Sequence, residues 1–435
     1  RGLGDVYKRQ AILRLTIRYI FSKVPLSIVG IIMSELNFYP TRSVQVIQND
    51  QQAINAAYQV ADFALEGRNQ RDQKRILPFE EIDQFSLKGL GGIRIPKRYG
   101  GAFVSNKTLA QVFRILNKAD SSVGQIPQNQ ISLLNLIDLM GTESQKHFIF
   151  NEILSGKRLA NGGPERHTKD SKTLQTTLTL KNGKYYLDGE KFYSTGSIFA
   201  HWLAIKAIHP EGHVVLVIVD RHSDGIEIIN NWNGFGQRTT ASGTVKLHQV
   251  IVDPDLIFDE RILTQAPTYR GAYSQLLQVA IDVGIAEAAF ADLISAVKKA
   301  RPILDAQVEK ASLEPYTLQE TGKLDILLNA AILLLDEAAE YLDELDQLNQ
   351  VTEQQAAKAS ILVAEAKVYA NDAALQISEK LLELGGSRAS LSQFNLDQHW
   401  RNARVHNLHD PVRWKIHAIG NYYLNGTLPA RHAWI

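Results

Sequence analysis

The chain has 435 residues, of which 45% are hydrophobic and 21% charged, with a formal net charge of +1. This length suggests two or three domains, and the composition excludes a disordered chain and a nucleic-acid binder held by bulk positive charge. No cysteine is present, which excludes disulfides, thiolate catalysis and cysteine-ligated zinc and fits a reducing cytoplasm.

The first 32 residues differ from the rest of the chain. They carry six basic side chains against the single acid Asp5, and their apolar run Ile28–Ile32 is too short to span a membrane. We expect the native product to begin at Met33 and residues 1–32 to be a non-native or disordered extension. No other segment approaches the length of a membrane helix, so we expect a cytoplasmic protein that makes no membrane contact.

Helical spacing dominates residues 33–159. After a helix start near residue 49, apolar residues recur at helical spacing at Ile54, Ala57, Tyr58, Ala61 and Leu65. Two further helices are predicted over Asn106–Ala119 and Ser121–Met140, and a capping box at Thr142–Gln145 opens another. We therefore predict an N-terminal α-helical domain over residues 33–159.

Residues 160–262 have the pattern of short strands. Alternation over Thr173–Leu180 is followed by Asn182-Gly183, a strong hairpin signal, and by a second strand at Tyr185–Asp188. Further strands are predicted at 203–208, 214–220, 226–229 and 245–252. Antiparallel strands at this spacing predict a central β-sandwich or barrel, and the absence of a βαβ pattern argues against a Rossmann nucleotide fold.

Residues 263–435 return to helical spacing. Two apolar rows with seven-residue spacing share one segment: Ile361, Val368, Leu375 and Leu382, and Val363, Ala370, Ile377 and Leu384. A helix that is apolar on more than one side is buried on more than one side, as in a bundle. We therefore predict an α+β multidomain fold that ends in a C-terminal four-helix bundle.

Histidine and arginine are concentrated near the C-terminus. His406, His409, Asp410 and His417 lie within a dozen residues. Pro411 disfavours helical backbone at the residue before it, so His409 and Asp410 are predicted on a loop between two helices, where reactive side chains often lie. Local composition alone equally fits a surface loop rich in histidine and arginine.

Three segments together resemble the acyl-CoA dehydrogenase superfamily, from about Val44 to the C-terminus. They are, in order, Ile-Pro-Lys-Arg-Tyr-Gly-Gly at 95–101, Glu-Lys-Phe-Tyr-Ser-Thr-Gly at 190–196 and Gly-Phe-Gly-Gln-Arg-Thr-Thr-Ala-Ser at 234–242. The closer resemblance is to its flavin-dependent monooxygenase branch, of the dibenzothiophene monooxygenase and sulfur-acquisition type. The markers of that branch are Trp232, residues 300–302 with 314–317, and residues 401–411.

The resemblance implies a flavin site. Phe192 is similar to the family's aromatic wall, Ser194 and Thr195 stand near flavin N5, and Asn161 and Trp232 are expected at the ring or substrate pocket. Arg301 resembles the arginine that holds the flavin phosphate. A neighbouring subunit would lend the segment with Gly385, Gly386 and Arg388, which implies a homo-oligomer, with the family's tetramer as the expected form.

The loop after residue 405 bears on the type of reaction. Simple dehydrogenases of this family carry a glutamate base here, whereas this chain has Asp410, one methylene shorter and followed by a proline. Misplacement by about 1 Å can cost on the order of 10²-fold in rate. The imidazole of His409, with Asp410, His406 and Ser194, suits proton exchange in an oxygenation near neutral pH. No third ligand accompanies His406 and His409, so we expect no metal there.

One departure from the dibenzothiophene enzymes concerns the substrate. Gln125 and Asn129 stand where those enzymes place a histidine and a tyrosine, which implies a smaller or more polar pocket. The resemblance thus implies a monooxygenase that uses O2 and reduced FMN, delivered by a separate flavin reductase, on a small organosulfur compound. The absence of a Gly-x-Gly-x-x-Gly motif after a strand agrees with a separate reductase.

Two alternatives stay open at this point. One is an acyl-CoA dehydrogenase that binds FAD and uses Asp410 as its base. The other is a non-catalytic oligomeric scaffold that keeps the fold and binds no flavin.

Overall fold

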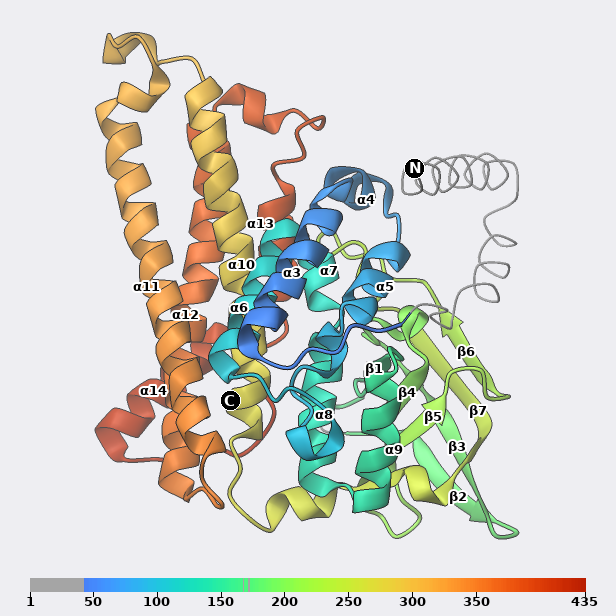
Figure 1. Cartoon of the computed structure of the whole chain (residues 1–435). Coiled ribbons are helices and arrows are strands. Elements are labelled where there is room, and N and C mark those ends of the chain that lie inside the picture. Colours follow the sequence, from blue (N-terminus) through green and yellow to red (C-terminus); the bar gives the residue numbers. More distant parts are fainter. Residues whose placement is uncertain (1–42, 167, 171–172) are drawn as a thin grey trace, which may run out of the picture. The chain divides into compact units, whose positions relative to one another are not determined.

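The computed structural model describes residues 43–435 except 167, 171 and 172. Figure 1 shows these residues in colour, with helices at both ends of the sequence and strands between them. The predicted extension over residues 1–32 lies outside the described residues. Within the described residues, none of the helices has both the length and the apolar character that a membrane span requires.

The N-terminal region is helical as predicted. Its starts are fixed by side chains that accept backbone N–H groups: Asn49 accepts from Gln52, and Thr142 forms the predicted capping box with Gln145. The helices are α3 (Asp50–Leu65), α4 (Arg68–Lys74), α5 (Phe79–Leu87), α6 (Asn106–Ala119), α7 (Ser121–Gln125), α8 (Gln128–Met140) and α9 (Glu143–Leu154).

The single helix predicted over Ser121–Met140 is wrong, because the structure has two helices there. Asp120 starts α7 by accepting the backbone N–H groups of Ser122 and Val123. Pro127 has no N–H group to continue the hydrogen-bond pattern, so α7 ends and α8 begins anew after the proline. The break places the buried Gln125 at the C-terminal end of α7.

The central strands form one eight-stranded sheet in the order β6-β7-β3-β2-β4-β5-β8, with β1 paired to β4. The predicted Asn182-Gly183 turn joins β2 to β3, and both residues have positive φ, as such turns require. The strands are β1 (Leu159–Gly162), β2 (Thr177–Lys181), β3 (Lys184–Lys191), β4 (Trp202–Ile208), β5 (Val214–Asp220), β6 (Ile226–Ile229), β7 (Thr244–Val252) and β8 (Ile257–Asp259).

The sheet is mixed, which corrects the prediction of antiparallel strands alone. β1 pairs with β4 in parallel, and β2 meets β4 in parallel at Thr177 and Ile208. β1 is only four residues long and mostly buried, so it shows no alternation and was not predicted. A parallel neighbour requires a long connection, and here the chain returns to β4 only after the β2–β3 hairpin.

The C-terminal helices form the predicted bundle. Figure 1 shows α10, α11 and α12 running side by side. In α12, Val363, Ala370 and Ile377 are fully buried, whereas Val368 and Leu375 of the other row are only partly buried in the single chain. The helices are α10 (Arg270–Lys299), α11 (Pro315–Asp346), α12 (Glu353–Leu384), α13 (Gln398–His406) and α14 (Val412–Asn425).

Gly284 of α10 sets how closely that helix packs on α6. A Cβ atom at this position would lie 2.7 Å from both the Arg114 carbonyl oxygen and the Asn117 Cβ, so any side chain would push the two helices apart. We predict that Gly284→Ala lowers the free energy of unfolding by about 1–3 kcal/mol, measured by chemical denaturation.

A matched control for this variant is Gly322→Ala. Gly322 lies inside α11, and no atom would come within 4 Å of its added Cβ. Alanine there should raise the free energy of unfolding by about 0.5–1 kcal/mol, because it favours the helix more than glycine does. If both variants changed the free energy of unfolding equally, close packing of α10 on α6 would not be the reason for glycine at position 284.

Candidate functional site

Two of the segments that resemble the acyl-CoA dehydrogenase superfamily, 190–196 and 234–242, meet beside the break between α7 and α8. The Ser194 N–H donates to the Gly243 carbonyl at 3.2 Å, and the Gly196 N–H donates to the Thr240 carbonyl at 3.2 Å. Gly196 has φ 78° and packs against Ile126, at the end of α7. The loop after β3, the loop 234–243 and the end of α7 therefore form one junction.

The hydroxyl groups of Ser194 and Thr195 lie in this junction, and only one of them has a hydrogen-bond partner within the described part of the chain. The Thr195 hydroxyl lies 2.7 Å from the Ser242 hydroxyl, which lies 2.8 Å from the Thr240 hydroxyl. Ser194 is fully buried, and its Oγ has no hydrogen-bond partner among the described residues. The Thr195 hydroxyl thus links the two loops, whereas the Ser194 hydroxyl has no protein partner among the described residues.

Several other buried polar atoms near this junction also lack a partner among the described residues. Such an atom costs roughly 1–3 kcal/mol when it stays unpaired. The elements that carry these atoms contact one another: α7 and α13 both contact α10, and the Gln237 N–H donates to Asn402 Oδ1 of α13 at 2.7 Å. The atoms are Ser121 Oγ, Gln125 Oε1, Ser197 Oγ, Gln237 Nε2, Gln278 Oε1, His406 Nε2 and the Asn407 amide.

Asp282 of α10 links this helix to α12 and α13. Its Oδ2 lies 2.6 Å from Lys367 Nζ of α12, and its Oδ1 lies 2.5 Å from His406 Nδ1 of α13. All three side chains are fully buried. Burial alone would raise the pKa of Asp282, but Lys367 and His406 lower it below its ordinary value.

This arrangement fixes the orientation of the His406 ring. A carboxylate can only accept hydrogen bonds, so His406 Nδ1 carries the proton that it donates to Asp282. The other ring nitrogen, Nε2, is buried and has no partner among the described residues.

His409 lies on the predicted loop between α13 and α14. Its Nδ1 donates to the His406 carbonyl at 2.9 Å, and the two imidazole rings are 5.2 Å apart. The residue keeps exposed surface in the single chain. Protein atoms packed around part of the ring, and the neighbouring His406, lower the pKa of His409 below its ordinary value.

Asp410 pairs with Lys415, and not with His409 as the sequence suggested. Its buried carboxylate lies 2.7 Å from the buried Nζ of Lys415 on α14, and Lys415 also donates to the Trp434 carbonyl. Burial lowers the pKa of Lys415, an effect that Asp410 opposes. Asp410 is thus held in an ion pair, while the hydrogen bond of His409 goes to the His406 backbone.

Phe192, the predicted aromatic wall residue, is covered by other side chains. Phe192 is buried, and the Arg166 guanidinium lies 3.0 Å from the centre of its ring. Tyr193, 53% exposed, packs edge-on against Phe192 and lies 6.2 Å from the ring of Trp232. Trp232 Nε1 donates to the Gln237 carbonyl at 2.8 Å, which places Trp232 at the edge of the junction.

The predicted phosphate residues gather at one end of the bundle. Arg301 follows α10, and Gly385, Gly386 and Arg388 follow α12. A Cβ on Gly385 would lie 3.2 Å from the Cβ of Ala296, near the end of α10. Both arginines are exposed and form no ion pair with a described residue. Since Ala296 lies 14 positions from Asp282, roughly 21 Å along α10, one chain does not bring these residues to His406.

The predicted pocket residues are divided between elements. Gln125 is buried with its Oε1 unpaired among the described residues, and Asn129 is partly buried on α8. Asn161 is partly buried on β1. α8 and β1 touch where the Leu159 N–H donates to Gln130 Oε1 at 3.0 Å, one residue from Asn129 and two from Asn161.

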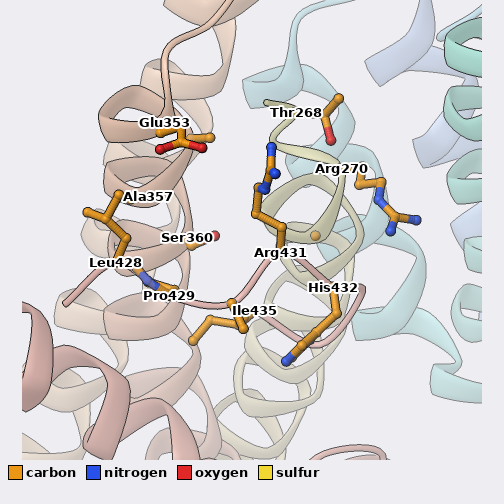
Figure 2. A pocket seen from close by; sticks show the side chains of 13 residues that line it. Thr268, Arg270, Glu353, Ala357, Ser360, Leu428, Pro429, Arg431, His432 and Ile435 are labelled. Atoms are coloured by element: carbon orange, nitrogen blue, oxygen red, sulfur yellow. The ribbon is translucent and has the colours of Figure 1, made fainter. Parts of the chain in front are cut away.

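A separate cavity of about 250 Å³ contains none of the predicted site residues. Figure 2 shows it between α10, α12 and the C-terminal tail, with Glu353, Arg270 and Arg431 around it. Its lining comes from the start of α10, the start of α12 and the C-terminal tail. It lacks the set of unpaired buried atoms described above, so we place the candidate site at the junction instead.

Sequence reasoning missed Asp282 and Lys367. Each is an ionisable residue within a run of buried helical residues, in α10 and α12 respectively. Because buried charges are almost always paired, that pattern could have indicated a pair. Their separation of 85 residues gives no signal in a local pattern.

Comparisons with known proteins identify the family of the chain. Residues 49–157 match the acyl-CoA dehydrogenase N-terminal domain family, and residues 276–414 match the acyl-CoA dehydrogenase C-terminal domain family. A dibenzothiophene monooxygenase from Mycolicibacterium goodii is 28% identical over 375 residues, covering 83% of this chain and 90% of the relative. A probable FMNH2-dependent monooxygenase, SfnC, from Pseudomonas putida is 28% identical over 384 residues, covering 87% and 95%.

Two solved structures extend the similarity over most of the chain. FMN-bound TdsC from Paenibacillus sp. A11-2 has a TM-score of 0.84 and 28% identity, covering 88% of this chain and 100% of TdsC. The methanesulfinate monooxygenase MsuC from Pseudomonas fluorescens has a TM-score of 0.80 and 26% identity, covering 88% and 99%. With its two matched domains and its mixed central sheet between helical regions, the chain belongs to the acyl-CoA dehydrogenase superfamily.

Proposed function

We propose that this protein is a flavin-dependent monooxygenase that uses O2 and reduced FMN, supplied by a separate flavin reductase, to oxygenate a small organosulfur compound. The relatives named above are monooxygenases, and the TdsC structure contains FMN. The observation that carries the choice of reaction is the Asp410–Lys415 ion pair, 2.7 Å long and buried. It places an ammonium group against Oδ2 of the carboxylate that a dehydrogenase would need as its base, and so opposes proton uptake there.

The junction fits a flavin because it combines an aromatic residue with unpaired polar atoms. Tyr193 supplies exposed aromatic surface beside the buried Phe192, and the unpaired Ser194 Oγ could donate to the polar edge of the ring. When bound, reduced FMN supplies the electrons that activate O2. The protein would bind and orient the ring and keep water from it.

In this proposal His409, rather than Asp410, exchanges the proton. Its Nδ1 donates to the His406 carbonyl, which leaves Nε2 as the ring nitrogen that can exchange a proton. His406 in turn is held by Asp282 and Lys367. Gln125, Asn129 and Asn161 would line the substrate side, where amide groups favour a small polar compound.

The exposed arginines support a site shared between subunits. Arg301 and Arg388 are too distant from His406 within one chain to serve the same flavin, but they could hold the phosphate of a flavin in a neighbouring subunit. The partly buried row with Val368 and Leu375 offers apolar surface for such an assembly. A cytoplasmic homotetramer, with domains at 33–159, 160–262 and 263–435, is part of the proposal.

Ser194→Ala tests the role of the buried hydroxyl. We predict that the amount of oxygenated product per reduced FMN falls about 10- to 100-fold, because the flavin loses one buried donor. The measurement mixes the protein, premixed with reduced FMN, with oxygenated buffer and a dialkyl sulfide or sulfone, and quantifies product and flavin reoxidation. Ser378→Ala is the control, because Ser378 Oγ donates to the Ala374 carbonyl inside α12 at 2.5 Å. Equal yields from Ser194→Ala and the unaltered protein would contradict the assignment.

Asp410→Asn separates the monooxygenase from the acyl-CoA dehydrogenase that binds FAD. We predict a loss of about 3 kcal/mol in the free energy of unfolding, because Lys415 stays buried without its carboxylate. Oxygenation by the folded variant should fall much less than the roughly 10²- to 10⁴-fold expected on removing a general base. Bleaching of bound flavin by an acyl-CoA under anaerobic conditions, abolished in Asp410→Asn, would establish the dehydrogenase instead.

A further inference from the structure

The turn between β4 and β5 brings two histidines face to face. Ile208 pairs with Val214 at the end of the ladder, and the pairing continues as the His209 N–H donates to the His213 carbonyl at 2.8 Å. Gly212, with φ 87°, closes the turn. Because opposite residues of a hairpin project from the same face, the two imidazole rings lie only 4.6 Å apart.

The turn also supplies a carboxylate to these rings. Glu211 Oε2 lies 3.9 Å from His209 Nδ1 and 3.8 Å from His213 Nδ1. These separations are too long for hydrogen bonds. One ligand atom from each of the three residues lies within 4.8 Å of the others, and the sequence at 209–213 is His-Pro-Glu-Gly-His.

His213 has a nitrogen that its surroundings leave unpaired. Its Nδ1 is buried and has no hydrogen-bond partner among the described residues, and its side chain is only 14% exposed. Its Nε2 faces Asp259 of β8 at 4.0 Å, but that carboxylate is already held by Arg261 at 2.7 Å. A cation between Nδ1 and Glu211 would satisfy the unpaired nitrogen.

We propose that His209, Glu211 and His213 bind a divalent transition-metal cation such as Zn²⁺. Two imidazoles and one carboxylate are a ligand set that zinc accepts, and a fourth position stays open to water. Tetrahedral zinc with ligands at about 2.1 Å places neighbouring ligand atoms roughly 3.4 Å apart, so each separation between Glu211 Oε2 and a histidine Nδ1 has to shorten by about half an ångström. The long 3.2 Å contact from the Glu211 N–H to His209 Nδ1 gives way to the metal.

This site is distinct from the flavin region. It lies at the tip of a hairpin of the central sheet, whereas the candidate flavin site uses the loop after β3 and the loop after α13. The metal site weighed from the sequence involved only His406 and His409, for which no third ligand was evident. A cation at 209–213 would fasten the hairpin tip and would take no part in the oxygenation.

The test is a calorimetric titration of the tag-free, chelator-treated full chain with Zn²⁺. We expect one Zn²⁺ per chain and an affinity that falls at least about 10-fold in His213→Gln and in Glu211→Gln. Zn²⁺ should also raise the melting temperature of the unaltered protein more than that of either variant, because a ligand of the native state stabilises it. Both substitutions lie at a surface turn, and circular dichroism checks that the variants fold.

The matched control is His248→Gln, because the His248 side chain is 88% exposed and lies outside the cluster. It should bind Zn²⁺ as the unaltered chain does. The proposal is overturned if the chain takes up no stoichiometric Zn²⁺, or if His213→Gln and Glu211→Gln bind it as tightly as the unaltered protein. Loss of binding in His248→Gln, with binding kept in the other two variants, would equally overturn it.

Discussion

The buried chain of contacts from Lys367 through Asp282 to His406 is the interaction on which the candidate site depends. It joins α10, α12 and α13 at a point that no water reaches. Removing one partner of such a pair typically costs about 3–5 kcal/mol, because the other charge is left buried and alone. The three helices are therefore fixed against one another where α13 ends, and the loop that carries His409 starts from that fixed point.

A second set of contacts holds α4 and the loop 234–243 of the sheet region against α13. Arg401 of α13 forms an ion pair with Asp72 of α4 at 2.7 Å, and a Cβ on Gly236 would lie 1.9 Å from the Arg401 carbonyl oxygen. Only glycine allows the loop 234–243 to lie this close to α13. The hydroxyl of Ser194 and the imidazole of His409 come from different regions of the chain, and these contacts hold both regions to α13.

Much of the fold could be predicted from the sequence, since long helices and the Asn182-Gly183 hairpin have strong local patterns. The break at Pro127 and the parallel strand β1 were missed, because a short buried strand has no periodicity and its pairing depends on distant residues. The loop carrying His409 was predicted correctly from Pro411. The ion pairs of Asp282 and Asp410, and the difference between Ser194 and Thr195, depend on which residues the fold brings together, and no local pattern contains that information.

The central claim is that this protein transfers an oxygen atom from O2 to an organosulfur compound. The most direct measurement incubates the full chain with a flavin reductase, FMN and a dialkyl sulfide or sulfone under ¹⁸O2, and determines the isotope content of the product by mass spectrometry. The account predicts a product with one ¹⁸O atom per turnover, formed only when the protein is present. A product with oxygen from water, or no product beyond that of reductase and FMN alone, would contradict it.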